Sequence, residues 1–209
     1  AARLFSVGFD GGLTLDNITV TQGYADGDGG AIYSWGTLAI NNCKFLANQA
    51  TLNGNGGAVA AFGPLTVNDS EFGGNQAANG GALYATGLRA VATITNSTFH
   101  DNAALATNYG WGGAIYQSAA ASMMIHGGAL RANRASSGGG IYVYGDVNSA
   151  LLTVDGGSVL AANAATGIGG GIVNQNGSVT LTDITLEGNT AESGGGIYST
   201  QGFVQLAGV

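Results

Sequence analysis

Short runs in which apolar and polar residues alternate recur along the whole chain. The run LTLDNITV, which begins at Leu13, is one example, and related runs cover residues 13–20, 38–45, 65–72, 92–99, 123–130, 152–159 and 179–186. An alternation with a period of two places every second side chain on the same face of a β-strand. No stretch combines helical spacing of apolar residues with helix caps. The pattern therefore predicts an all-β chain of short strands.

Two further motifs repeat in step with these runs. The tetrapeptide Gly-Gly-(Ala or Gly)-aliphatic starts at intervals of 24 to 32 residues, at Gly29, Gly56, Gly80, Gly112, Gly138, Gly169 and Gly194. An aromatic residue or Leu followed by x-x-Asn precedes six of the seven, and the first copy, Val20 to Gly23, lacks the Asn. A unit of ~25 residues cannot bury its own apolar face, whereas stacked units can. We therefore expect seven copies of one structural repeat.

Aligning the copies brings similar residues into three apolar columns. The first is Ile32, Val59, Leu83, Ile115, Ile141, Ile172 and Ile197. The second is Leu15, Ile40, Val67, Ile94, Ile125, Val154 and Leu181. The third is Val20, Phe45, Phe72, Phe99, Leu130, Leu160 and Leu186. Three columns are what a three-sided coil places inside, with like residues stacked about 4.8 Å apart.

The columns predict a right-handed single-stranded parallel β-helix, or β-solenoid, of about seven coils. The handedness follows from the rule that crossovers between parallel strands are right-handed. We expect a single domain over residues 1–209, with an N-terminal end segment at 1–12 and the seven repeats at 13–209.

The composition excludes several classes of protein. The chain has 39 Gly among 209 residues without a collagen period, and 45% hydrophobic residues, which is too many for a disordered chain. Five cations against twelve acids argue against nucleic acid or anionic membranes as partners. No apolar run reaches the ~18–20 residues of a membrane helix, so no membrane insertion is expected. One Cys cannot form an internal disulfide.

The paired motifs resemble a known repeat. GGAI at Gly29 and at Gly112, together with FLAN, FGGN and FHDN at Phe45, Phe72 and Phe99, resembles the repeat of chlamydial polymorphic outer-membrane proteins and of similar bacterial surface proteins. The resemblance covers nearly the whole chain, although later copies read GGGI. It implies a β-helix at an extracellular or bacterial cell-surface location. It also implies an adhesive or structural role without shared catalytic residues.

The Gly-Gly pair and the Asn residues are expected to have structural roles. Gly provides a positive φ or allows two backbone segments to approach closely, as a tight corner requires. Stacked amides can bond to their neighbours and satisfy the polar groups of turns. We therefore predict a ladder formed by Asn48, Asn75, Asn102, Asn133, Asn163 and Asn189. A second column, Asn17, Asn42, Asp69, Asn96 and Asp183, is interpreted in the same way.

A column of tyrosines provides the candidate binding residues. Each follows the aliphatic residue of the Gly-Gly motif, so the column faces outward: Tyr33, Tyr84, Tyr116, Tyr142 and Tyr198. An exposed Tyr stripe can stack on sugar rings or contact a protein. The alternative is that these residues favour strands and pair between coils. An inserted loop adds Tyr109 and Trp111.

Catalytic and metal-binding groups show no convincing constellation. Asp69 with Glu71, and Asp183 with Glu187, are carboxylate pairs by proximity only, and His100 and His126 fall in different coils. Cys43 aligns with small or aliphatic residues and is expected to be buried.

We therefore expect no enzymatic activity and no cofactor. The one calcium candidate is Asp26-Gly-Asp28, which resembles the start of a calcium loop without the remaining ligands.

The expected function is structural. Neither 1–12 nor the final segment contains an evident cap, so the chain is either a segment of a longer surface protein or a subunit that stacks end to end. We expect a non-enzymatic extracellular component of a cell-surface fibre or layer, with itself as partner. The alternative is an adhesin or autotransporter-type passenger segment that binds carbohydrate or a host surface protein. A third possibility is a carbohydrate-active β-helix enzyme, a polysaccharide lyase or hydrolase.

Overall fold

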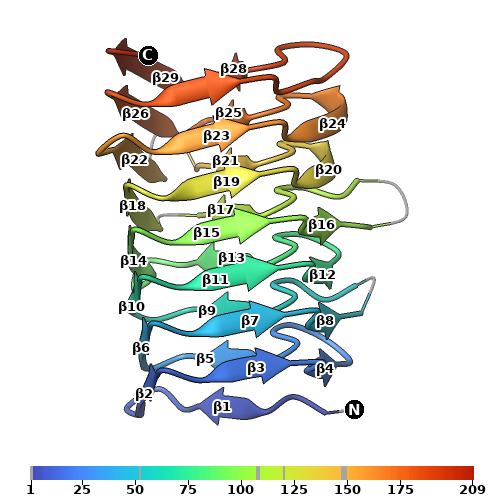
Figure 1. Cartoon of the computed structure of the whole chain (residues 1–209), viewed down its shortest axis with the longest axis vertical. Helices are drawn as coiled ribbons and strands as arrows, with labels where there is room; N and C mark the ends of the chain where they lie inside the picture. The colour runs from blue at the N-terminus through green and yellow to red at the C-terminus, as the bar shows by residue number, and fades with distance from the viewer. Residues whose placement is uncertain (1, 52, 107–108, 120, 147–149) are drawn as a thin grey trace.

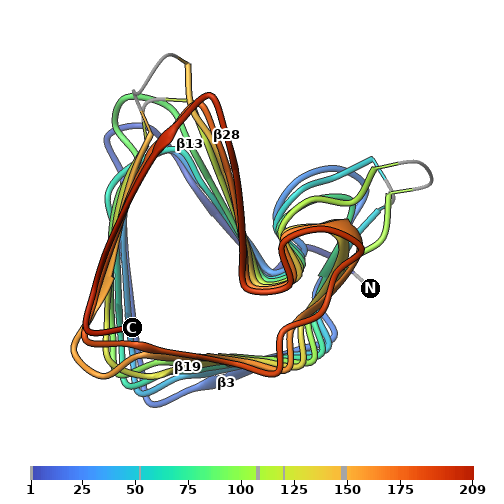
Figure 2. The ribbon, with the colours of Figure 1, turned by 90° about the horizontal axis from the view of Figure 1, so that it is seen from above.

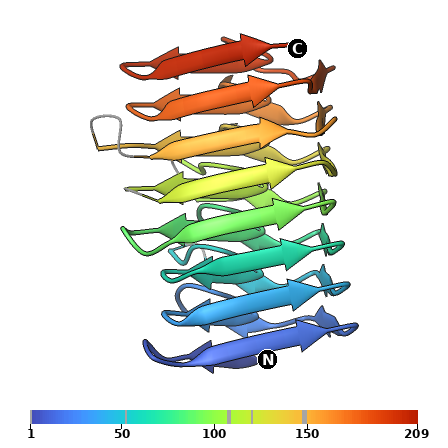
Figure 3. The same ribbon diagram turned by 90° about the vertical axis from the view of Figure 1, so that its left-hand side faces the viewer.

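The chain winds into a stack of coils made of short β-strands (Figures 1 and 3). The computed structural model describes residues 2–51, 53–106, 109–119, 121–146 and 150–209. All regular elements in these ranges are strands, and all the strand pairs are parallel. No helix in them could span a membrane. The fold is therefore an all-β parallel solenoid of about seven turns, as the repeats predict.

Each coil contributes one strand to each of four sheets, A to D, with few exceptions. Sheet A consists of β1 (Phe5–Val7), β5 (Ile32–Ser34), β9 (Val59–Ala61), β13 (Leu83–Thr86), β17 (Ile115–Ser118), β21 (Ile141–Tyr144), β25 (Ile172–Gln175) and β28 (Ile197–Thr200). Sheet B consists of β2 (Gly12–Asp16), β6 (Thr37–Asn41), β10 (Leu65–Asn68), β14 (Val91–Thr95), β18 (Ser122–His126), β22 (Leu151–Asp155), β26 (Ser178–Thr182) and β29 (Phe203–Ala207).

The other two sheets have shorter strands. Sheet C consists of β3 (Thr19–Thr21), β7 (Lys44–Leu46), β11 (Glu71–Gly73), β15 (Thr98–His100), β19 (Ala129–Arg131), β23 (Val159–Ala161) and β27 (Thr185–Glu187). Sheet D consists of β4 (Tyr24–Ala25), β8 (Gln49–Ala50), β12 (Gln76–Ala77), β16 (Ala103–Ala104), β20 (Arg134–Ser137) and β24 (Ala164–Ile168).

Sheet D makes the expectation of a three-sided coil wrong. Figure 2 shows a cross-section that bends inward between sheet D and sheet A instead of closing as a triangle. Most strands of sheet D have only two residues, too short for an alternation to be visible in the sequence. Their buried members form a fourth column of small side chains: Ala25, Ala50, Ala77, Ala104, Ala135 and Ala165.

The three predicted columns form the main core. Strand pairing places each member opposite its counterpart in the next coil, as in Ile32 with Val59 and Ile40 with Val67. In the third column the rings of Phe45, Phe72 and Phe99 stack nearly parallel, with centroids 5.0 and 4.6 Å apart. The core is thus a set of vertical stacks of like residues. Cys43 is buried beside it, as expected.

Residues in the left-handed conformation hold the corners. The Asn/Asp column marks the corner between sheets B and C, where φ lies between 48° and 56° at Asn17, Asn42, Asp69, Asn96 and Asp183. Asn and Asp tolerate this region better than most other side chains. The corner before sheet A uses glycine instead. Gly29 has a φ of 68°, and a Cβ there would lie 2.2 Å from the carbonyl oxygen of Ile32.

The second glycine of each pair has a different role. A Cβ on Gly30 would lie 2.2 Å from the carbonyl oxygen of Gly57 in the next coil. Adjacent coils therefore touch backbone to backbone at this corner, which only glycine allows.

The Asn ladder runs through the corner between sheets C and D. Asn102, which is fully buried, donates from Nδ2 to the carbonyl of Phe72 (2.9 Å) and to Oδ1 of Asn133 (3.0 Å). Its own Oδ1 accepts from the backbone N–H and the Nδ2 of Asn75, both at 2.9 Å. Every polar atom of the amide is therefore satisfied, and each rung joins two coils. Asn48, Asn75, Asn133 and Asn163 repeat the arrangement.

The ladder makes a stability prediction. Asn102→Leu leaves the groups of Asn75 and the Phe72 carbonyl buried without partners, so we expect the free energy of unfolding to fall by about 3–5 kcal/mol. Asn189 is partly exposed at the last rung, where water can replace the lost bonds. Asn189→Leu, the matched control, should cost less than half as much. Urea unfolding measures both, and equal losses would contradict the prediction.

Candidate binding face

The predicted Tyr column lies on the outer side of sheet A. Strand pairing aligns Tyr84 with Tyr116 and Tyr116 with Tyr142, while Tyr198 pairs with Val173. In Figure 2, sheet A forms one wall of the inward bend, and the segment that returns from sheet D forms the other wall. The outer face of sheet A therefore looks across at a second part of the same coil, and not directly into solvent.

This placement corrects the expectation that the whole column is exposed. Tyr116 is 8% exposed and Tyr142 is 5% exposed, and with Val173 they form a second, smaller apolar cluster. Trp111 and Ile168, from the opposite wall, pack against them. The Trp111 ring centroid lies 5.9 Å from that of Tyr116 and 5.6 Å from that of Tyr142. The bend is thus filled by aromatic side chains at this level.

Burial keeps these phenols neutral. Burial raises the pKa of the Tyr142 hydroxyl to about 12, and the neighbouring Tyr144 adds to the shift. Burial also raises the pKa of Tyr116. The Tyr142 hydroxyl donates to Oε1 of Gln175. The middle of the column therefore packs and forms hydrogen bonds as neutral groups, and its binding role stays a prediction.

Trp111 is positioned by a short polar ladder that the motifs did not reveal. Asp28 Oδ1 accepts from the backbone N–H of Asn55 at 2.8 Å, and Asn55 Oδ1 accepts from Nδ2 of Asn79 at 2.9 Å. Asn79 Oδ1 accepts from the backbone N–H of Trp111 at 3.0 Å. These residues all stand directly before a Gly-Gly pair, a regularity that the sequence does carry. Tyr109 is 69% exposed beside Trp111.

The end of the face opposite Tyr109 consists of two rings that sequence reasoning missed. Trp35 is 43% exposed and stacks on Phe62, with centroids 4.4 Å apart and planes 17° apart. The Trp35 indole N–H donates to the Tyr33 hydroxyl at 2.9 Å, which fixes its orientation. Trp35 stands two residues after Tyr33, and Phe62 stands two residues after Ala60, which occupies the Tyr33 position in the next coil. The period-two rule could therefore have placed them on this face.

The rings join into one continuous aromatic face. Successive contacts run from Trp35 through Phe62, Tyr84, Tyr116 and Tyr142 to Trp111 and Tyr109. From β5 to β21 the face climbs four coil spacings, or about 20 Å. Its chemistry consists of ring faces bordered by hydroxyl and amide groups. Such a surface suits stacking and hydrogen bonding more than ionic recognition.

The titratable groups gather elsewhere, on the outer face of sheet C. Lys44 Nζ lies 2.7 Å from the Glu71 carboxylate, and His100 contacts Glu71 at 3.2 Å and Asp101 at 2.8 Å. His126 is on sheet B, where it pairs with Asp155 at 2.6 Å. The two histidines are therefore not brought together.

In each carboxylate pair suggested by sequence, the two residues have different structural settings. Glu71 is held by Lys44 and His100, while Asp69 and Asp183 occupy left-handed corners. Glu187 is in β27. In the described ranges, no three His, Cys, Asp or Glu residues form a group suited to a metal ion.

The calcium candidate has a structural contact. One carboxylate oxygen of Asp28 accepts both from the backbone N–H and from Nδ2 of Asn55. Asp26 is exposed. Calcium binding at this pair stays an untested prediction.

The sheet C cluster predicts a pH-dependent stability. The hydrogen bond to Asp101 is the main cause of the raised pKa of His100. The protonated His100 therefore stabilises the fold fully below the ordinary pKa of 6.5, and this stabilisation is lost as pH rises through the raised pKa. Lys44, and then His100, lower the Glu71 pKa, so its stabilisation is present above 4.5 and is lost as pH falls through the lowered pKa. Between pH 4.5 and 6.5, both His100 and Glu71 therefore contribute to the stability of the fold.

We expect His100→Gln to destabilise the fold by less than about 1 kcal/mol at pH 5.5, because the pair is partly exposed. The loss should shrink by pH 9. Asp101→Asn, which keeps a residue suited to the left-handed region, should flatten the same profile. Unfolding at both pH values measures this, and a His100→Gln effect that is independent of pH would contradict it.

Comparison with known proteins supports the repeat assignment. Three segments, residues 69–86, 96–118 and 183–200, match the Chlamydia polymorphic membrane protein (Chlamydia_PMP) repeat. Each begins at a left-handed Asn or Asp corner and ends in or at the end of a strand of sheet A. No curated protein and no solved structure matches the chain. The chain thus carries repeats of the Chlamydia polymorphic membrane protein type, built into a parallel β-solenoid.

Proposed function

We propose that this chain is a β-helical segment of a bacterial cell-surface protein, of the passenger type, and that it acts as a rigid rod that displays binding surfaces. The observation that carries the proposal is the match of three segments to a repeat named for a membrane protein of Chlamydia. Each matched segment includes the left-handed corner, the Asn rung and the Gly-Gly corner that join one coil to the next. The matched features are therefore those that build a rod.

The proposed role is display and binding, without catalysis or a cofactor. The Glu71 carboxylate is engaged by Lys44 and His100 on an open sheet surface. The aromatic face, by contrast, is a connected series of rings that lie outside the main core. Carbohydrate or a host surface protein are the partners that such a face suits.

Surface display is tested on intact cells of the source organism. Antibodies raised against the folded chain should label unpermeabilised cells, and a non-penetrating protease should remove the label. An antibody to a cytoplasmic protein should label only permeabilised cells, as a control. Labelling that appears only after permeabilisation would overturn the proposal.

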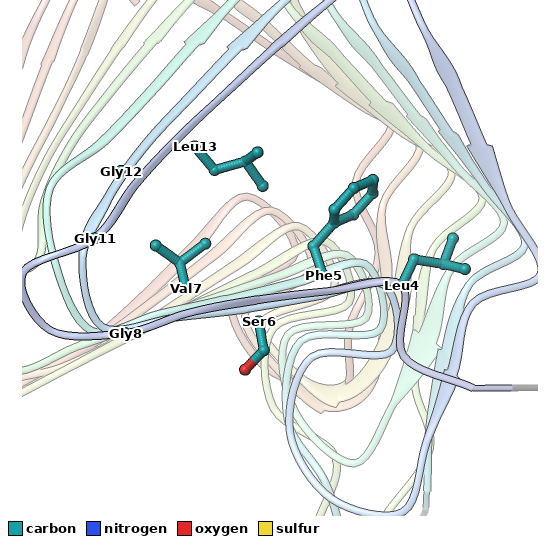
Figure 4. A pocket seen from close by; sticks show the side chains of 8 residues that line it. All are labelled: Leu4, Phe5, Ser6, Val7, Gly8, Gly11, Gly12 and Leu13. Carbon is teal, nitrogen blue, oxygen red and sulfur yellow. The ribbon is translucent and has the colours of Figure 1, made fainter.

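End-to-end association is a second candidate function, because both ends of the stack expose core positions. Figure 4 shows Phe5 and Leu13, which are both partly exposed, pointing into the first coil. At the other end, Leu206 continues an inward column but is 52% exposed. A further coil, from the same chain or from a second copy, would cover these surfaces. If a second copy continued the strand register, Leu206 of one copy would stack on Leu15 of the next.

A charge at this end tests the association. We expect Leu206→Asp to stop filament growth of the purified chain without unfolding it, because the charge would be buried unpaired between copies. Gln205→Asp is the matched control. Gln205 is the residue before Leu206, and because its side chain faces outward, an Asp there would stay in water. Electron microscopy across protein concentration measures growth, and circular dichroism verifies the fold. Filaments from the Leu206→Asp variant, or none from the parent chain, would reject end stacking.

A further inference from the structure

A hollow of about 470 Å³ opens where the chain leaves sheet A for sheet B. It lies at the Trp35 end of the aromatic face, and its lining includes Phe9, Trp35, Phe62, Thr86, Leu88 and Arg89. These residues follow or end β1, β5, β9 and β13, so four successive coils contribute to one site. Its volume falls within the range of about 300–1,000 Å³ that small-molecule sites occupy.

The apolar walls are exposed and, in part, fixed. Phe9 is 54% exposed and Leu88 is 86% exposed, and both border the stacked pair of Trp35 and Phe62. The hydrogen bond to Tyr33 holds the Trp35 indole in place without a ligand. A ring held rigid before binding loses little conformational entropy when a ligand stacks on it. The C–H face of a sugar ring is a ligand surface of this shape.

Arg89 provides the charge of the hollow. Its guanidinium lies over the Phe9 ring, 4.2 Å from the centroid. Among the residues that the structure describes, it takes part in no ion pair. A guanidinium stacked in this way keeps its in-plane N–H groups for a carboxylate, which they match in a bidentate geometry. Arg3, Arg131 and Arg134 likewise take part in no ion pair among the described residues, so Arg89 is distinguished by its stacked position at the hollow.

A hydroxyl group supplies a further polar contact. Thr86 Oγ1 accepts from the Ser118 hydroxyl at 2.7 Å, so the Thr86 hydroxyl proton remains available for donation. A sugar hydroxyl in the hollow can accept it.

We propose that this hollow binds a carboxylated sugar residue of a glycan. The sugar ring stacks on Trp35, its carboxylate accepts from Arg89, and a hydroxyl accepts from Thr86. A protein strand is a poorer occupant, because each inner strand of sheet A is already paired on both edges and has no free backbone to offer. This inference rests on the binding role proposed above and names its ligand class. Labelling of cells and sugar binding by the purified chain are separate measurements, so either proposal can fail alone.

The two tryptophans allow a direct test. Only Trp35 and Trp111 contribute indole N–H signals to an ¹⁵N NMR spectrum, and the Trp111→Phe variant assigns them. Sialyllactose and trigalacturonate are the carboxylated probes, lactose and maltotriose are the neutral ones, and an acidic tripeptide represents protein. We expect a carboxylated sugar to shift the Trp35 signal and leave the Trp111 signal in place, with a Kd of about 1 mM.

Variants at arginine separate the charge from the fold. Arg89→Met should weaken binding of the carboxylated sugar at least about tenfold. Arg89→Lys, which keeps the charge but loses the planar fork, should fall between Arg89→Met and the parent. Arg131→Met, on the exposed face of sheet C, is the matched control and should bind as the parent does. An unchanged melting temperature shows that Arg89→Met is folded.

Several outcomes would overturn the site. These are equal binding of neutral and carboxylated sugars, equal binding by the Arg89→Met and Arg131→Met variants, a shift confined to Trp111, or tighter binding of the tripeptide. Absence of any Trp35 shift with either carboxylated probe at about 20 mM, well above the expected Kd, would overturn it as well.

Discussion

Register between successive coils is the constraint on which the rest of this structure depends. A parallel strand bonds to neighbours on both edges at about 4.8 Å, so every coil must turn at the same places as the coils beside it. The left-handed Asn and Asp residues fix the corner between sheets B and C, and Gly29 and its counterparts fix the corner before sheet A. Once the corners coincide, like residues stack. The apolar columns therefore follow from the corners as much as they stabilise them.

The buried amides turn this register into a requirement. A buried Asn that lacks partners destabilises a fold, but Asn102 bonds to Asn75 below and Asn133 above, and to the backbone of Phe72. A coil displaced by one residue would leave these groups unpaired at two interfaces at once. The ladder thus opposes slippage, in addition to the buried apolar columns, which a one-residue slip would turn toward solvent. Stability is then shared between nearest neighbours along the rod.

Repeated features with a clear period were predictable from sequence, whereas very short strands and contacts that occur once were not. Three core columns could be found because their residues recur seven times with a clear period. Sheet D could not, because a strand such as Gln76–Ala77 is too short to alternate. The burial of Tyr116 depends on Trp111, whose position is set by contacts with Asn79 across an inserted loop. The position of Trp111 before a Gly-Gly pair is visible in the sequence, but its packing on Tyr116 is not, since that contact arises from where the chain returns after sheet D.

Binding chemistry on such a scaffold is expected at its irregular positions. The inward residues of each coil are constrained by the coils on either side, whereas outward residues and corner loops can change without disturbing the register. Trp35 and Phe62 follow strands of sheet A where most other coils carry small or polar residues, and Arg89 stands in a corner loop that the preceding coil lacks. The periodicity of the sequence explains the interior of this protein. The residues that depart from this periodicity form the hollow, where the exposed, fixed ring of Trp35 and the unpaired guanidinium of Arg89 lie together.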